Sequence, residues 1–138
     1  MDYHKISRRV YYGDTDKMNV YYANYLYWYE QARIEFLRSV NINYKDLEAS
    51  GLGLPIAKVI CNYKAELHLD DEFVVITSIS ELTKWSITFY HQLVVDTKVV
   101  NIATIKAVLV DLQTKKLAQW PSDIYKILER LEEHNELL

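Results

Sequence analysis

The spacing of apolar residues changes from about four to two near residue 54, and this change constrains the fold more than any other feature of the chain. Residues 23–40 contain neither Gly nor Pro, and their apolar stripe has helical spacing: Tyr25, Tyr29, Ala32, Phe36 and Val40. From residue 54 onward apolar and polar residues alternate instead, as in strands buried on one face. The sequence therefore predicts one long helix followed by a run of strands.

Short turns separate the predicted strands. We predict strands over residues 4–12, 56–65, 72–82, 85–95 and 99–112, a short helical segment over 44–49, and a last helix over 122–136 with Ser122 as its N-cap. Strands joined by short turns pair antiparallel, and the long helix must then lie on one face of their sheet. The expected class is α+β: a curved antiparallel sheet wrapped around one long central helix, with an extra C-terminal helix. No linker or repeat divides residues 1–138, so we expect a single domain.

Charge and cysteine content exclude several classes of protein. Nineteen acidic and sixteen basic residues give a net charge of −3, which disfavours a nucleic-acid partner. The one cysteine, Cys61, excludes a disulfide framework and a four-cysteine zinc site, and we expect it to be a buried structural residue. The N-terminus lacks the apolar segment of a signal peptide, and no apolar run approaches the ~20 residues of a membrane helix. We expect a cytoplasmic protein without membrane insertion, metal or cofactor.

Tyrosine is unusually frequent, with twelve Tyr against three Phe. Tyrosine combines an apolar ring with a polar hydroxyl, so a cluster of tyrosines suits a partly wet cleft or a subunit interface. The alternative is that tyrosine is used here as a good strand former. The sequence leaves both readings open.

The run Gly13-Asp14-Thr15-Asp16 is the most promising chemical feature, although a solvated turn would also use these residues. It lies between the first predicted strand and the start of the long helix, where unpaired N–H groups and a positive dipole end are expected. Such N–H groups can polarise a carbonyl, and a nearby carboxylate can attack that carbonyl or activate a water. Together these two elements suit the hydrolysis of an activated acyl compound such as a thioester.

Several motifs of the chain together resemble the signature of the hotdog-fold acyl-CoA thioesterases. They are the runs 12–18 (YGDTDKM), 22–26 (YANYL) and 29–33 (YEQAR), followed by the later stretch 63–72 (YKAELHLDDE). The similarity is greatest to the 4-hydroxybenzoyl-CoA thioesterase branch, which includes the thioesterase associated with the Tol–Pal system. The resemblance implies a hotdog fold and an enzyme that hydrolyses an acyl thioester to a free acid and a thiol.

The resemblance also implies roles for individual residues. It makes Asp16 the catalytic carboxylate, and it places the N–H that polarises the thioester carbonyl near Tyr22. It adds Asn24 and Tyr25 to the substrate-binding residues. The residues themselves leave alternatives: Asp16 as a plain turn residue, Asp14 as a brace of the turn, and Asn24 as the N-cap of the helix. Within the long helix, we expect Glu30 and Arg33 to form a local ion pair.

For partners, the resemblance implies an acyl-CoA substrate, or an acyl carrier protein thioester, and a homodimer or homotetramer with active sites at the subunit interface. The loop differs from the family pattern, because Asn19 stands where Gly is usual and the segment from Asp16 to Asn24 is one residue shorter. Asn tolerates the left-handed backbone that such a Gly would adopt. Two other functions remain open. One is a non-catalytic dimer of the same fold that binds acyl thioesters. The other is a dehydratase, which would need a His paired with a carboxylate, and no His lies near Asp16 in the sequence.

Overall fold

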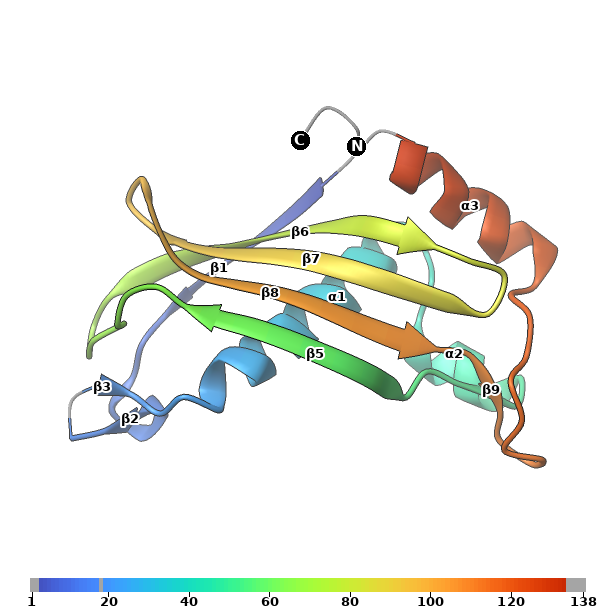
Figure 1. The fold of residues 1–138 in the computed structure, drawn as a ribbon, viewed down its shortest axis with the longest axis horizontal. Coiled ribbons are helices and arrows are strands. Elements are labelled where there is room, and N and C mark those ends of the chain that lie inside the picture. Colours follow the sequence, from blue (N-terminus) through green and yellow to red (C-terminus); the bar gives the residue numbers. More distant parts are fainter. Residues whose placement is uncertain (1–2, 18, 134–138) are drawn as a thin grey trace.

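The computed structural model describes residues 3–17 and 19–133 (Figure 1). Its main sheet is formed by β1 (Tyr3–Arg9), β6 (Glu72–Leu82), β7 (Ser86–Val95), β8 (Lys98–Val108) and β5 (Ile56–Tyr63). The helices are α1 (Asn24–Ser39), α2 (Tyr44–Ala49) and α3 (Ser122–Glu133), with a short 3-10 turn, η1 (Tyr12–Asp14). Two small hairpins pair β2 (Thr15–Asp16) with β3 (Asn19–Val20) and β4 (Leu52–Gly53) with β9 (Val110–Asp111).

The main sheet has the order β1-β6-β7-β8-β5, and every neighbouring pair is antiparallel. The helix α1 lies along one face of this curved sheet (Figure 1). Alternate residues of β6 and β7 point toward it and are buried, as the two-residue period predicts: Phe73, Val75, Thr77, Ile79, Ile87, Phe89, His91 and Leu93. The α+β class, the single long helix and the additional C-terminal helix are confirmed.

Several predicted boundaries are wrong in detail. The helix α3 begins at Ser122 itself, so Ser122 is not its N-cap, and residues 134–136 of the predicted helix lie outside the described residues. The first strand ends at Arg9. The strand predicted over 99–112 is two strands, because the N–H of Leu109 donates to the carbonyl of Trp85 and the chain then leaves the sheet to pair with β4.

The ion pair expected between Glu30 and Arg33 is absent from the described residues, so this prediction is wrong. Arg33 is buried near the Tyr44 hydroxyl of α2, and its Nε and Nη1 have no hydrogen-bond partner among the described residues. Burial lowers the pKa of its guanidinium. Nearby in the core, Nδ1 of His91 lies 2.8 Å from Oγ1 of Thr77. No described helix is long and apolar enough to cross a membrane.

Candidate functional site

The run Gly13-Asp14-Thr15-Asp16 forms η1 and the first strand of the β2–β3 hairpin. The Asp14 carboxylate accepts a 2.9 Å hydrogen bond from the N–H of Tyr11, so it braces the turn that begins η1. Among the described residues of the hairpin, Lys17 is left-handed, with φ of 54°. Asn19 instead belongs to β3, so it does not adopt the left-handed conformation that we considered for it.

Hydrogen bonds hold the turn η1, which leads into this hairpin, against the segment that begins α1. The carbonyl of Asp14 accepts the N–H of Tyr21 at 3.1 Å and the side-chain amide of Asn24 at 2.6 Å. The N–H of Val20 donates to the carbonyl of Leu67, which ties the hairpin to the connection between β5 and β6. Asn24 is the first residue of α1 and its N-cap is Ala23, so the N-cap reading of Asn24 is wrong. Its side chain fixes the loop to the helix instead.

The structure places Asp16 on the exposed side of β2, opposite Asn19. Within the described chain, no hydrogen bond or ion pair uses its carboxylate. It lies close enough to Tyr21 to influence the pKa of that hydroxyl. The pKa of Tyr21 is raised, mainly by a hydrogen bond with Tyr22 and to a smaller extent by the negative charge of Asp16. An exposed, unbonded carboxylate therefore lies beside the residues that precede α1.

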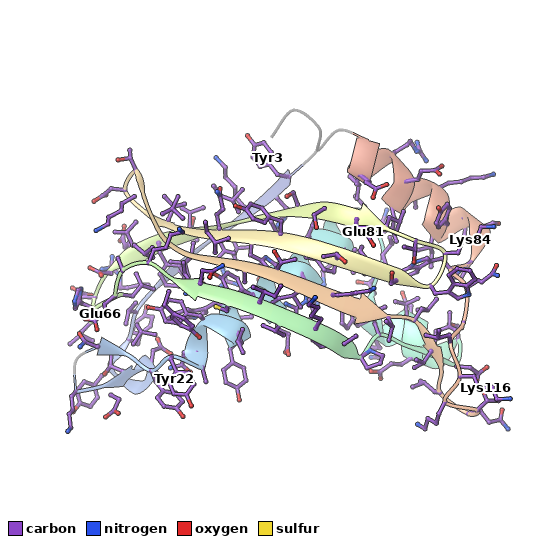
Figure 2. The ribbon with its side chains drawn as sticks, viewed as in Figure 1. Tyr3, Tyr22, Glu66, Glu81, Lys84 and Lys116 are labelled. Carbon is purple, nitrogen blue, oxygen red and sulfur yellow. The ribbon has the colours of Figure 1, made fainter. Side chains whose placement is uncertain are left out.

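The peptide groups that precede α1 contain unpaired hydrogen-bond donors. Among the described residues, no acceptor is found for the N–H groups of Tyr22 and Ala23. Unpaired N–H groups of this kind, at the positive end of the helix dipole, can stabilise a developing oxyanion. The Tyr22 side chain is largely exposed, and it lies at the same end of the molecule as Glu66 of the connection between β5 and β6 (Figure 2).

Tyr25 is placed differently from the other predicted site residues, because its side chain is only 3% exposed. Its hydroxyl accepts the N–H of Leu67 at 3.3 Å, and its ring meets Trp28 edge to face. Burial raises the pKa of this hydroxyl. Tyr25 thus forms the floor beneath the loop, while Asp16 and Tyr22 lie at the surface.

The distribution of tyrosines contradicts one of the two readings of the composition. Only Tyr3, Tyr63 and Tyr90 lie in strands, so the strand-former reading is wrong. Large exposed tyrosines come instead from the loop, the first turns of α1 and the end of β5: Tyr11, Tyr12, Tyr21, Tyr22, Tyr27 and Tyr63. These exposed side chains offer apolar rings with polar hydroxyl groups to the solvent.

Tyr63 begins one of the family-like motifs, but the sequence predicted no role for it in the site. It is the last residue of β5, and its hydroxyl donates a 2.9 Å hydrogen bond to the carbonyl of Tyr22. The alternation of apolar residues predicted a strand over residues 56–65, two residues longer than β5, and gave Tyr63 no separate role. Cys61, two residues earlier, is partly exposed rather than buried, and its thiol donates to the Asn101 side chain at 3.2 Å.

Comparison with known proteins places this chain in one family. The thioesterase-like superfamily matches residues 10–128 of this chain. Acyl-CoA thioesterase YbgC of Haemophilus influenzae is 36% identical over 84% of this chain and 87% of its own length. Acyl-CoA thioester hydrolase YbgC of Escherichia coli O6:H1 is 33% identical over 84% of this chain and 88% of its own.

Solved structures agree with these sequence relatives. A hypothetical protein from Aquifex aeolicus is 30% identical, with a TM-score of 0.85 over 91% of this chain and 98% of its own. The gentisyl-coenzyme A thioesterase BH1999 is 28% identical, with a TM-score of 0.83 over 91% of this chain and 99% of its own. The predicted hotdog fold and the prediction of a thioester hydrolase are confirmed. The chain belongs to the thioesterase-like superfamily.

Proposed function

We propose that this protein hydrolyses an acyl-CoA thioester to a free acid and coenzyme A. The observation that carries the proposal is the position of Asp16, whose unbonded carboxylate lies on a hairpin that directly follows Asp14, and the carbonyl of Asp14 is hydrogen-bonded to Asn24 at the start of α1. Membership of the thioesterase-like superfamily and the activities named for its YbgC relatives support it. We further propose that residues 1–138 act as one domain, in the cytoplasm, and that an acyl carrier protein thioester is the second substrate to test.

In this proposal the thioester carbonyl oxygen accepts hydrogen bonds from the N–H groups of Tyr22 and Ala23. The Asp16 carboxylate acts either as the nucleophile that attacks the carbonyl carbon or as the base that takes a proton from the attacking water. Either route gives a tetrahedral oxyanion, whose charge the same N–H groups stabilise. The carbon–sulfur bond then breaks, and the thiolate leaves and takes up a proton. In the nucleophilic route, water then hydrolyses the acyl-aspartyl anhydride and restores Asp16. Asn24 and Tyr25 support the substrate pocket from the loop and from its floor.

We also propose a homodimer in which β5 pairs with β5 of a second copy, or a tetramer made of two such dimers. The sheet has two edges, and an exposed edge strand is a site for pairing with another chain. The β1 edge carries charges, with Arg8 and Arg9 in ion pairs. The β5 edge is apolar instead, with Ile56, Val59 and Ile60 each more than 40% exposed. A second copy would cover these side chains, and this pairing would place Asp16 near the subunit interface.

Hydrolysis of a panel of thioesters, followed by release of free thiol, tests the proposed function. The panel should contain aliphatic acyl-CoAs of graded length, 4-hydroxybenzoyl-CoA and other aromatic acyl-CoAs, and an acyl carrier protein thioester. The likeness to a gentisyl-coenzyme A thioesterase and the predicted 4-hydroxybenzoyl-CoA branch favour an aromatic acyl group. Turnover of at least one thioester supports the proposal. Tight binding of acyl-CoA without turnover would favour the non-catalytic acyl-thioester-binding dimer.

A further inference from the structure

Tyr63 connects the edge strand β5 to the segment that begins α1. Its hydroxyl lies 2.9 Å from the carbonyl oxygen of Tyr22. Among the described residues, this hydroxyl is the one hydrogen-bond donor to that carbonyl. The ring of Tyr63 packs edge to face on Tyr25, with 5.3 Å between ring centroids and 88° between ring planes. The ring is thus held by the floor of the site, and its hydroxyl is aimed at one peptide group.

That peptide group also contains the N–H of Ala23. A peptide unit is planar and trans, so its carbonyl and its N–H point in opposite directions. A hydrogen bond that fixes the Tyr22 carbonyl therefore fixes the direction of the Ala23 N–H as well. This N–H has no acceptor among the described residues, and it is directed away from Tyr63. The hydroxyl of Tyr63 consequently determines the direction of the Ala23 N–H, although the hydroxyl contacts the opposite, carbonyl side of the peptide.

We propose that Tyr63 is a positioning residue for thioester hydrolysis, because its hydroxyl holds the Tyr22–Ala23 peptide in the orientation that directs the Ala23 N–H at the substrate carbonyl. The inference rests on the proposed function and extends it to a residue on β5. Two physical effects support it. A fixed donor needs no reorganisation when charge develops on the oxyanion. Hydrogen bonds in a chain also polarise one another, so a carbonyl that accepts a bond makes the N–H of the same peptide a stronger donor.

The chemistry of Tyr63 suits a permanent donor. Burial and the neighbouring Cys61 raise the pKa of its hydroxyl to about 12, so the group keeps its proton at neutral pH. The side chain is nevertheless 49% exposed. A hydrogen bond at such a position contributes little to the free energy of folding, because water replaces it in a variant. Loss of the hydroxyl should therefore change the reaction rate more than the stability.

The test is the variant Tyr63→Phe, which keeps the ring on Tyr25 and removes only the hydroxyl. Its matched control is Tyr90→Phe on β7, whose hydroxyl accepts from the Gln92 side chain and does not contact the Tyr22–Ala23 peptide. We expect kcat of Tyr63→Phe to fall about tenfold with KM within about twofold, since removal of a whole oxyanion donor costs roughly a hundredfold or more. The control should keep the kcat of the unmodified protein. The unfolding midpoint and the mass in light scattering should be unchanged for both variants.

A second measurement separates this inference from the proposed function. The ¹⁵N and ¹H NMR shifts of the Ala23 amide should change in Tyr63→Phe and stay constant in Tyr90→Phe, whether or not any thioester is turned over. Absence of turnover by the unmodified protein contradicts the proposed function, and an altered Ala23 amide in Tyr63→Phe then still supports the positioning of this peptide. Unchanged Ala23 shifts, or a full kcat in Tyr63→Phe when the unmodified protein is active, would overturn the role of Tyr63.

Discussion

The side-chain amide of Asn24 donates a hydrogen bond across 2.6 Å to the backbone carbonyl of Asp14. This contact joins the first residue of α1 to the loop that ends in the hairpin of Asp16. The same Asp14 carbonyl accepts the N–H of Tyr21, so these two hydrogen bonds join Asp14 to the segment that begins α1. The Asn24 contact therefore helps to hold the loop that precedes Asp16 against the start of α1.

Replacement of Asn24 by Ala should lower both stability and turnover. The lost hydrogen bond should cost about 1 kcal/mol in the free energy of unfolding, and kcat should fall because the hairpin is no longer held. Asn24→Asp sharpens the test, because a carboxylate cannot donate to the Asp14 carbonyl and would repel it. We expect Asp to be at least as harmful as Ala in denaturant titrations. Normal stability and turnover of Asn24→Asp would show that the contact is unimportant.

Phe36 anchors the last turn of α1 in the core. Its side chain is 2% exposed, and its ring stacks on His4 with centroids 5.7 Å apart. Phe36→Ala should lower the free energy of unfolding by about 3–5 kcal/mol, since it removes a buried ring and leaves a cavity. Leu117→Ala is the control, because Leu117 is 63% exposed and its truncation should cost less than about 0.5 kcal/mol. A loss below about 1 kcal/mol for Phe36→Ala would contradict this packing.

Stability should fall as the pH drops below the ordinary pKa of histidine, because of His91. Burial, and secondarily the charge of Arg33, hold the pKa of His91 well below the usual 6.5. Below pH 6.5 the His91 side chain therefore binds a proton in the unfolded chain but stays neutral in the folded chain. Protonation consequently favours unfolding.

For this one group, the free energy of unfolding should decrease by about 1 kcal/mol between pH 6.5 and 5.5. Denaturant titrations at both pH values measure this decrease. In His91→Gln, which has no titrating group at this position, the free energy of unfolding should decrease by about 1 kcal/mol less than in the unmodified protein. Equal pH dependence of the two proteins would mean that His91 is protonated equally in the folded and unfolded states.

Assembly through β5 should be sensitive to a charge placed on that edge. Val59→Lys should convert a dimer, with twice the 16.3 kDa of one chain, into a monomer. Ser7→Lys makes the same change in charge on the opposite edge strand, β1, and should leave the mass unchanged. Light scattering at micromolar concentration measures both. A monomeric unmodified protein, or a dimer that survives Val59→Lys and is lost in Ser7→Lys, would contradict pairing through β5.

The strands and helices were predictable where one periodicity dominates. β6 and α2 have the predicted bounds, and α1 is one residue shorter at each end than predicted. These elements were predictable because burial on one face of a strand or helix requires apolar residues at regular spacing in the sequence. The β4–β9 pairing was missed, since two-residue strands carry no periodicity.

Within the candidate site, local sequence identified the loop but not its attachments. Asp16 and the helix start are neighbours along the chain, so their proximity could be expected. Tyr63 lies about forty residues from Tyr22, and no spacing rule predicts that its hydroxyl reaches one carbonyl. The burial of Arg33 was missed for the same reason, because its neighbour Tyr44 comes from α2 and only the tertiary fold brings the two together.

Turnover by Asp16→Asn tests the central claim most directly. The substitution keeps the size of the side chain and removes the negative charge, so the group can neither attack a thioester carbonyl nor take a proton from water. We predict that kcat falls about a hundredfold or more while KM changes little, because Asp16 acts mainly in the transition state. Asp96→Asn, at an exposed turn between β7 and β8, is the matched control and should keep full activity. Near-normal kcat of Asp16→Asn, on a thioester that the unmodified protein hydrolyses well, would contradict the assignment of Asp16 as the catalytic carboxylate.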